Sequence, residues 1–170
     1  MTAKVKKIIS QEYIEDLDSR LFSSENSDAI IDMDKFIISQ QNLIKFIVNK
    51  ISDYPTSIQE KSNFINFFIW KAFEENISEI SINKLLILYE QNKTWFQKII
   101  SVDKEYIFKT LKKEMLIIRQ PYLLNWVLEE LLQDSKLFEE INFEIQSELF
   151  ILFKTIIDIF DIEVNDNYLK

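Results

Sequence analysis

The chain has 170 residues, of which 47% are hydrophobic and 14% aromatic, and its formal net charge is −8. This content is enough to bury a core, so a disordered chain is disfavoured, and the length fits one all-helical domain over residues 1–170. Histidine, cysteine and glycine are absent. Their absence excludes Ser-His-Asp and Cys-His catalysis, conventional zinc sites and glycine-rich phosphate loops.

The fold class follows from turn residues and from hydrophobic period. With no glycine and only two prolines, the usual turns of β-hairpins are missing. Apolar residues instead recur at helical spacing along the chain. We therefore predict an all-α protein of about seven to nine helices, arranged either as an irregular helical bundle or as a short HEAT/armadillo-like array. A weak echo at a spacing of 42, which aligns Leu85-Leu86 with Val127-Leu128, leaves both arrangements open.

The first predicted helix covers residues 3–21 and is followed by a polar loop over residues 22–29. A second helix is expected from about residue 30 or 34 to Ser52, where Pro55 follows. Residues 56–59, Thr-Ser-Ile-Gln, match a capping box. In this motif the hydroxyl of the first residue and the side-chain amide oxygen of the fourth each accept a hydrogen bond from the other residue's backbone N–H at the start of the helix. They predict a third helix that runs to about Asn76.

Ser81 predicts the start of a helix to about Gln91, and a second capping box at residues 94–97 predicts a separate start of one or two turns. The next helix is expected from residues 101–103 to Arg119. Pro121 suits a first helical position and predicts a helix to Gln133. A last pair is expected at about 136–142 and 145–162, with residues 163–170 as a flexible tail.

No stretch approaches the roughly 20 apolar residues that span a bilayer. The richest, residues 149–160, contains Lys154 and Asp158. The basic N-terminus is not followed by an apolar run, so a secretory signal is not expected, and the lack of cysteine fits a reducing compartment. We therefore expect a cytoplasmic protein that does not associate with membranes.

Acidic residues are concentrated in the last third of the chain. Residues 120–170 hold eleven acidic and three basic side chains, whereas residues 93–119 have a net charge of +4. The acidic third favours attraction to a basic partner and disfavours nucleic acid, although a solvated face that keeps the protein soluble also explains it. The basic residues Lys109, Lys112, Lys113 and Arg119 are expected to pair with the acidic C-terminal helices.

Pairs of carboxylates three or four positions apart are candidates for binding a hard cation such as Mg²⁺. Such pairs are Glu12/Glu15, Glu75/Glu79 and Glu140/Glu144. Exposed helix faces explain the same spacing, because solvated side chains need no metal. We therefore expect no metal, no cofactor and no catalytic residue.

The remaining features favour a non-enzymatic, acidic helical module that binds a basic protein, as an immunity-like antitoxin does when it neutralises a toxin enzyme. The expected contact residues are acidic side chains with a tryptophan anchor, namely Glu129, Glu130, Glu139, Glu140, Glu144, Trp126 and Trp95. Core positions are the other interpretation of both tryptophans. The alternative functions are a scaffold helical-repeat protein that self-associates as a homodimer, and an enzyme with a carboxylate-bound Mg²⁺.

Overall fold

The computed structural model describes residues 8–22, 27–73, 77–102, 118–133 and 142–166. Within these ranges there is no strand, which confirms the predicted all-α class. The elements are α1 (Gln11–Phe22), α2 (Ser27–Ser39), α3 (Gln41–Ile51), α4 (Thr56–Phe73), α5 (Ile82–Val102), α7 (Pro121–Gln133), α9 (Phe143–Asp161) and the π-helix η2 (Ile162–Asp166).

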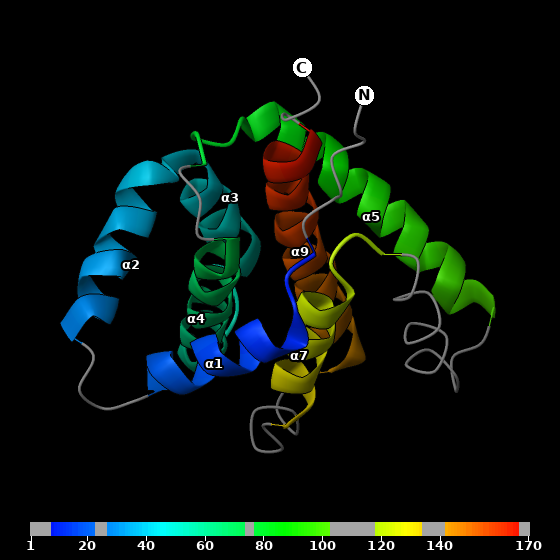
Figure 1. The fold of residues 1–170 in the computed structure, drawn as a ribbon. Helices are drawn as coiled ribbons and strands as arrows, with labels where there is room; N and C mark the ends of the chain where they lie inside the picture. Colours follow the sequence, from blue (N-terminus) through cyan, green and yellow to red (C-terminus); the bar gives the residue numbers. More distant parts are fainter. Residues whose placement is uncertain (1–7, 23–26, 74–76, 103–117, 134–141, 167–170) are drawn as a thin grey trace, which may run out of the picture.

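Helix α9 lies in the middle of the fold and packs against α4, α5 and α7 (Figure 1). Every residue from Leu149 to Asp161 is buried, so this helix is apolar on all sides apart from a few charged residues. One helix surrounded by helices from three other parts of the chain forms an irregular bundle. In a stacked array, by contrast, each repeat would contact only its neighbours.

Aromatic contacts join α9 to the helices around it. The Phe160 ring lies 5.7 Å from that of Phe73 in α4, and the Phe150 ring lies 5.4 Å from that of Phe96 in α5. Phe153 and Phe160 are fully buried. Tilted aromatic pairs of this kind contribute more than the area they bury. The apolar run of residues 149–160 is thus the centre of the core.

The helix predicted to run on to Ser52 is broken at Gln40, where the backbone leaves the helical region with φ −127° and ψ 45°. The buried Gln40 amide donates to the carbonyls of Ile77 and Ser78 and accepts a bond from the Ile80 amide. The break therefore places Gln40 against the segment that precedes α5. The contact partners lie 37–40 positions away, so local sequence carries no signal of it.

Helix α5 is continuous, so the separate start predicted at residues 94–97 is wrong. The hydroxyl of Thr94 donates to the carbonyl of Glu90, one turn back, at 2.9 Å instead of capping a new helix. The reason is the inward face of α5, where buried residues recur at helical spacing through this region: Leu85, Tyr89, Asn92, Phe96 and Ile99.

The predicted start of α4 at Thr56 is confirmed, although the capping box does not form as expected. The side-chain amide of Gln59 donates to the carbonyls of Ser52 and Tyr54 and thereby closes the turn between α3 and α4. Helix α1 begins at Gln11, where the Ser10 hydroxyl accepts a bond from the Tyr13 amide at 3.2 Å.

Some predictions towards the two ends of the chain differ from the structure. Residues 163–166, predicted as the start of a flexible tail, belong to η2, where Val164 is buried and Glu163 pairs with Lys84 at 2.5 Å. Helix α2 begins at Ser27, inside the predicted loop. The helix expected from residues 101–103 to Arg119 and the helix expected at about 136–142 lie mostly outside the described residues. Residues 118–120 are described and are not helical. None of the helices that the structure describes combines the length and the apolar character needed to cross a membrane.

Candidate functional site

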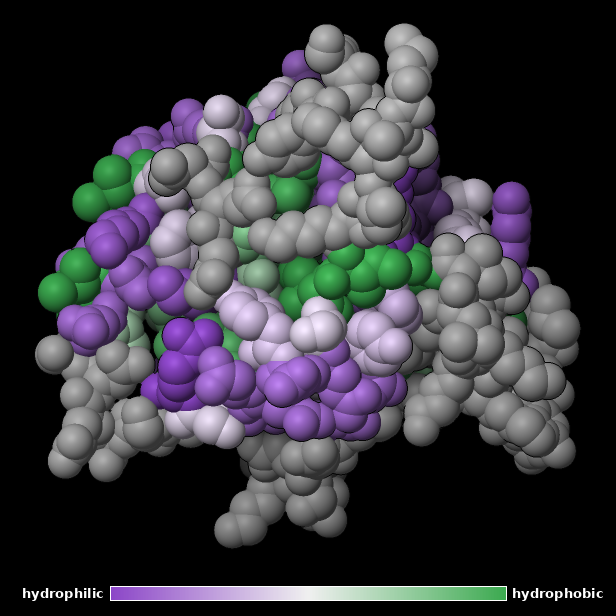
Figure 2. All heavy atoms as spheres, in the orientation of Figure 1, coloured by the Kyte–Doolittle hydropathy of each residue, from purple (hydrophilic) through white to green (hydrophobic). Residues whose placement is uncertain are grey.

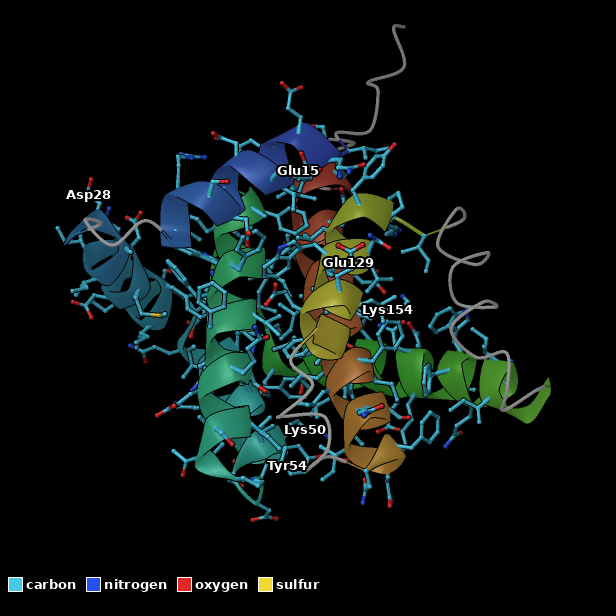
Figure 3. The ribbon with its side chains drawn as sticks, turned by 90° about the horizontal axis from the view of Figure 1, so that it is seen from below. Glu15, Asp28, Lys50, Tyr54, Glu129 and Lys154 are labelled. Atoms are coloured by element: carbon cyan, nitrogen blue, oxygen red, sulfur yellow. The ribbon has the colours of Figure 1, made fainter. Side chains whose placement is uncertain are left out.

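An acidic surface forms where α1 crosses α7. The two helices pack against each other, and the Trp126 indole of α7 donates to the Asp18 carboxylate of α1 at 3.2 Å, over 108 positions of sequence. Figure 3 shows Glu15 and Glu129 on the same side of the molecule, on these neighbouring helices. We call this surface the acidic face and define it as Glu12, Glu15, Asp16, Asp18, Glu129 and Glu130.

The helical period of α1 and α7 explains why these carboxylates point outward. In α1, Ile14 and Leu17 are buried, and Glu12, Glu15 and Asp16 therefore fall on the exposed side, whereas Asp18 is directed towards α7. In α7, Leu124, Val127 and Leu131 face the core and leave Glu129 exposed. The acidic face thus rests on helices whose inner sides are fixed in the core.

The acidic face is only partly neutralised. The two helices hold six acidic residues and one basic residue, Arg20, for a net formal charge of −5. Arg20 pairs with Asp16 at 3.0 Å, and Lys61 of α4 pairs with Glu130. Within the described residues, four of the six carboxylates have no ion-pair partner, namely Glu12, Glu15, Asp18 and Glu129. Glu15 and Glu129 accept hydrogen bonds from neutral amides, and Asp18 accepts one from the Trp126 indole.

Asp18 lies at the centre of this surface. Burial raises the pKa of Asp18 above its usual range, because the carboxylate loses contact with water, and repulsion from Glu130 raises it further. The hydrogen bond from Trp126 and the charge of Lys61 act in the opposite direction. Asp18 is therefore a carboxylate whose charged form is disfavoured by its surroundings.

Trp126, a predicted anchor, is a core residue. Its side chain is 9% exposed and stacks on Phe68 of α4, with ring centroids 3.6 Å apart and an interplanar angle of 11°. A partner cannot reach this ring while the protein is folded, because Phe68 and the acidic face cover it. Trp95, the other predicted anchor, lies half-buried on α5, where its ring covers the Lys154 ammonium at 4.9 Å.

The predicted acidic contacts divide into three groups. Glu129 and Glu130 both belong to the acidic face. Glu144 lies in the first turn of α9. Burial and the nearby Glu148 are the main causes that raise the pKa of Tyr54, and the charge of Glu144 contributes a smaller part. Glu144 therefore belongs to neither of the two helices, α1 and α7, that carry the acidic face. Glu139 and Glu140 lie outside the described residues.

Glu12, Glu15 and Asp16 were not expected as contact residues. Their outward spacing on a helix could be read from the sequence, and Glu12/Glu15 attracted attention only as a cation pair. The sequence does not show that α1 lies against α7. Ile14 and Leu17 of α1 and Trp126 of α7 are buried where the two helices pack, and this packing brings the carboxylates of α1 beside those of α7.

A second polar cluster lies inside the fold, between α5 and α9. The Lys154 ammonium donates to Asp158 and, at 3.0 Å, to the Asn92 carbonyl oxygen. The Asn92 amide donates to Thr155 and Asp158 at 3.2 and 3.1 Å. All four side chains are buried. The cluster pairs the two charges that α9 brings into the core, although the Oδ1 atom of Asp158 has no hydrogen-bond partner among the described residues. We interpret the cluster as a contact that holds α9 against α5.

A third polar cluster links both ends of the described chain. Asp161 is fully buried and accepts from Arg119 at 3.1 Å, from Gln120 and from Asn165. The side-chain oxygen Oε1 of Gln120 accepts from the Ile9 backbone amide at 2.9 Å. This confirms, for Arg119, the expected pairing of the basic stripe with the C-terminal helices. The other members, Lys109, Lys112 and Lys113, lie outside the described residues.

Of the three carboxylate pairs, only Glu12/Glu15 lies fully within the described ranges. Glu79 accepts from the backbone amide of Asn42 at 3.1 Å, and Glu75 and Glu140 fall outside these ranges. In the part of the chain that the structure describes, no three acidic side chains are placed to hold a metal ion together. The acidic face is therefore the candidate site. Comparison of the chain with protein-family models, curated proteins and solved structures finds no match.

Proposed function

We propose that the chain is a non-enzymatic protein-binding module of the cytoplasm, and that its acidic face binds a basic surface on a partner protein. One observation carries the proposal. Two helices far apart in the sequence bring six carboxylates together where they meet, and four of these have no ion-pair partner among the described residues. Exposed like charges repel one another, so a basic partner would relieve a cost that the folded protein carries.

The chemistry of the face selects its partner. A cluster of one sign of charge accelerates the encounter with an oppositely charged surface and repels nucleic acid. Arginine is the best-matched group, because its guanidinium binds a carboxylate through two parallel hydrogen bonds. Since α1 and α7 are fixed by their buried sides, the helices that carry the carboxylates do not have to be ordered on binding, which reduces the entropy lost on association.

An immunity-like antitoxin that covers a basic toxin enzyme is the specific form of this proposal. A toxin that acts on an anionic substrate needs a cationic site, and the acidic face would occupy such a site in the substrate's place. The absence of histidine, cysteine and glycine supports a protein that acts by binding rather than by catalysis. The contact would consist of Glu12, Glu15, Asp16, Glu129 and Glu130.

A matched pair of charge-reversal variants tests the proposal. The test variant is Glu15→Lys/Glu129→Lys, and the control is Asp53→Lys/Glu90→Lys, which changes the net charge equally at exposed sites on α5 and near α3. The partner is captured from host extract with the wild-type chain, purified and titrated with each variant. The test variant should bind at least about tenfold more weakly and the control nearly as well as wild type. Equal weakening by both variants would contradict the proposed site.

A further inference from the structure

Helix α2 carries an apolar face that the fold leaves uncovered. Four isoleucines on its outer side are 71%, 53%, 45% and 71% exposed, namely Ile30, Ile31, Ile37 and Ile38. Figure 1 places α2 at the edge of the molecule, and Figure 2 shows apolar side chains along its outer rim. Contiguous exposed apolar residues of this kind mark protein contact sites.

The outer face cannot be explained by the packing of α2 itself. The opposite side already holds α2 in place, since Phe36 is buried with its ring 5.3 Å from Trp70, and Asp32 bonds Lys71 of α4 at 2.9 Å. Isoleucine is also a weaker helix former than the straight-chain residues, so four outward isoleucines do not serve the helix. Their burial requires another surface.

The charges on this face complement each other. Asp34 is exposed and forms no ion pair with any described residue. Lys35 bonds Asp32 at 2.8 Å, but Asp32 is also held by Lys71, and the Lys35 side chain is 63% exposed. Lys35 can therefore turn to a new acceptor without leaving Asp32 unpaired. If a second copy of α2 lies antiparallel to the first, the carboxylate of Asp34 in each copy can therefore meet the ammonium of Lys35 in the other.

We propose that two copies of the chain pair through α2, antiparallel, about a two-fold axis between Asp34 and Lys35. This register sets Asp34 of each copy opposite Lys35 of the other, and Ile31 opposite Ile38. A two-fold contact uses the same patch on both copies, as this self-complementary pattern requires. An axis centred on Asp34 would instead bring two carboxylates together, which disfavours it. The acidic face on α1 and α7 stays outside the contact.

Sedimentation equilibrium of the intact chain across the micromolar range tests the pairing. The apparent mass should rise with concentration from 20.4 kDa towards twice that value. Ile38→Glu should raise the dissociation constant at least about tenfold, because it buries a charge in the contact. The matched control is Ile87→Glu on α5, a 61% exposed isoleucine outside the contact, which should leave the constant unchanged. Circular dichroism checks that both variants remain folded.

A charge exchange tests the register. Asp34→Lys and Lys35→Asp each place like charges across the axis and should each weaken pairing by about tenfold. The double variant Asp34→Lys/Lys35→Asp restores opposite charges and should return the dissociation constant to within about threefold of wild type. A mass that stays at 20.4 kDa at every concentration overturns the proposal. So does a dimer that is indifferent to Ile38→Glu, or one that the double variant fails to restore.

Discussion

The Trp126 indole and the Asp18 carboxylate are joined by a hydrogen bond of 3.2 Å that connects α7 to α1. The donor ring is itself stacked on Phe68, so its position is fixed by the core. Burial and the nearby Glu130 make the charged form of Asp18 unfavourable. The hydrogen bond between Trp126 and Asp18 therefore stabilises the packing of α1 on α7, whereas the charge of Asp18 opposes it.

Asp18→Asn should make the protein at least as stable as wild type at pH 7, because the amide oxygen can still accept from Trp126 without a charge. The raised pKa of Asp18 means that the folded state binds this proton more tightly than the unfolded state. The cost of the carboxylate therefore appears as the pH rises through the pKa and is absent in acid. Urea unfolding at pH 7 and at about pH 3 measures the difference. Asp16→Asn is the control on the same helix, and a loss of stability for Asp18→Asn at pH 7 would contradict the assignment.

Asp32→Asn should have the opposite effect. Hydrogen bonds from Lys35 and Lys71 lower the pKa of Asp32 below its usual value, so the carboxylate stabilises the fold above its unfolded pKa. The variant should lose roughly 1–2 kcal/mol at pH 7, and the loss should vanish as the pH falls through the folded pKa. Unfolding is followed at neutral and acidic pH, at protein concentrations that keep the chain monomeric. Asp34→Asn is the control, because Asp34 lies two residues further along the same helix and is exposed. This variant should change the stability little.

Lys154→Met should be strongly destabilising, by about 3–5 kcal/mol, because it leaves the buried Asp158 carboxylate without its ammonium. The double variant Lys154→Met/Asp158→Leu removes both charges and should recover most of that loss. Denaturant unfolding monitored by circular dichroism gives both values. If the double variant is no more stable than the single one, the cluster does not act as a charge pair.

Gln40→Ala should cost about 1–3 kcal/mol, since it removes three hydrogen bonds to the segment before α5 and leaves buried backbone groups unpaired. The neighbouring Gln41→Ala is a suitable control. Gln41 is exposed, so the stability of that variant should stay within about 0.5 kcal/mol of wild type. Equal effects at the two positions would show that helix propensity, and not the buried amide, decides the outcome.

Local sequence was enough to predict the helices and several of their starts. Pro121 begins α7 at the first helical position, as predicted. Helix α4 begins at Thr56, as predicted, although the Gln59 side chain bonds the preceding turn instead of completing a capping box. The apolar run of residues 149–160 marked a helix, and the structure shows that it is the central one. These features depend on residues within a few positions of each other, which is why period and capping could identify them.

Features set by distant residues could not be predicted. The break at Gln40 depends on Ile77, Ser78 and Ile80, and the burial of Lys154 depends on Asn92, 62 positions earlier. The acidic face depends on α1 meeting α7. The sequence accordingly indicated Glu129 and Glu130 as contact residues but missed the α1 carboxylates beside them, and it offered Trp126 as an anchor although the ring is buried.

The central position of α9 also determines when the protein can fold during its synthesis. The helices that pack on it, α4, α5 and α7, all precede it along the chain. At roughly 5–20 residues per second, the stretch from Val102 to Asp161 takes about 3–12 s to be made. Throughout that time the ribosome-bound chain presents the apolar faces of α4 and α5 without their partner. Chaperone demand and aggregation of this protein should therefore respond to the rate at which its final helix is translated.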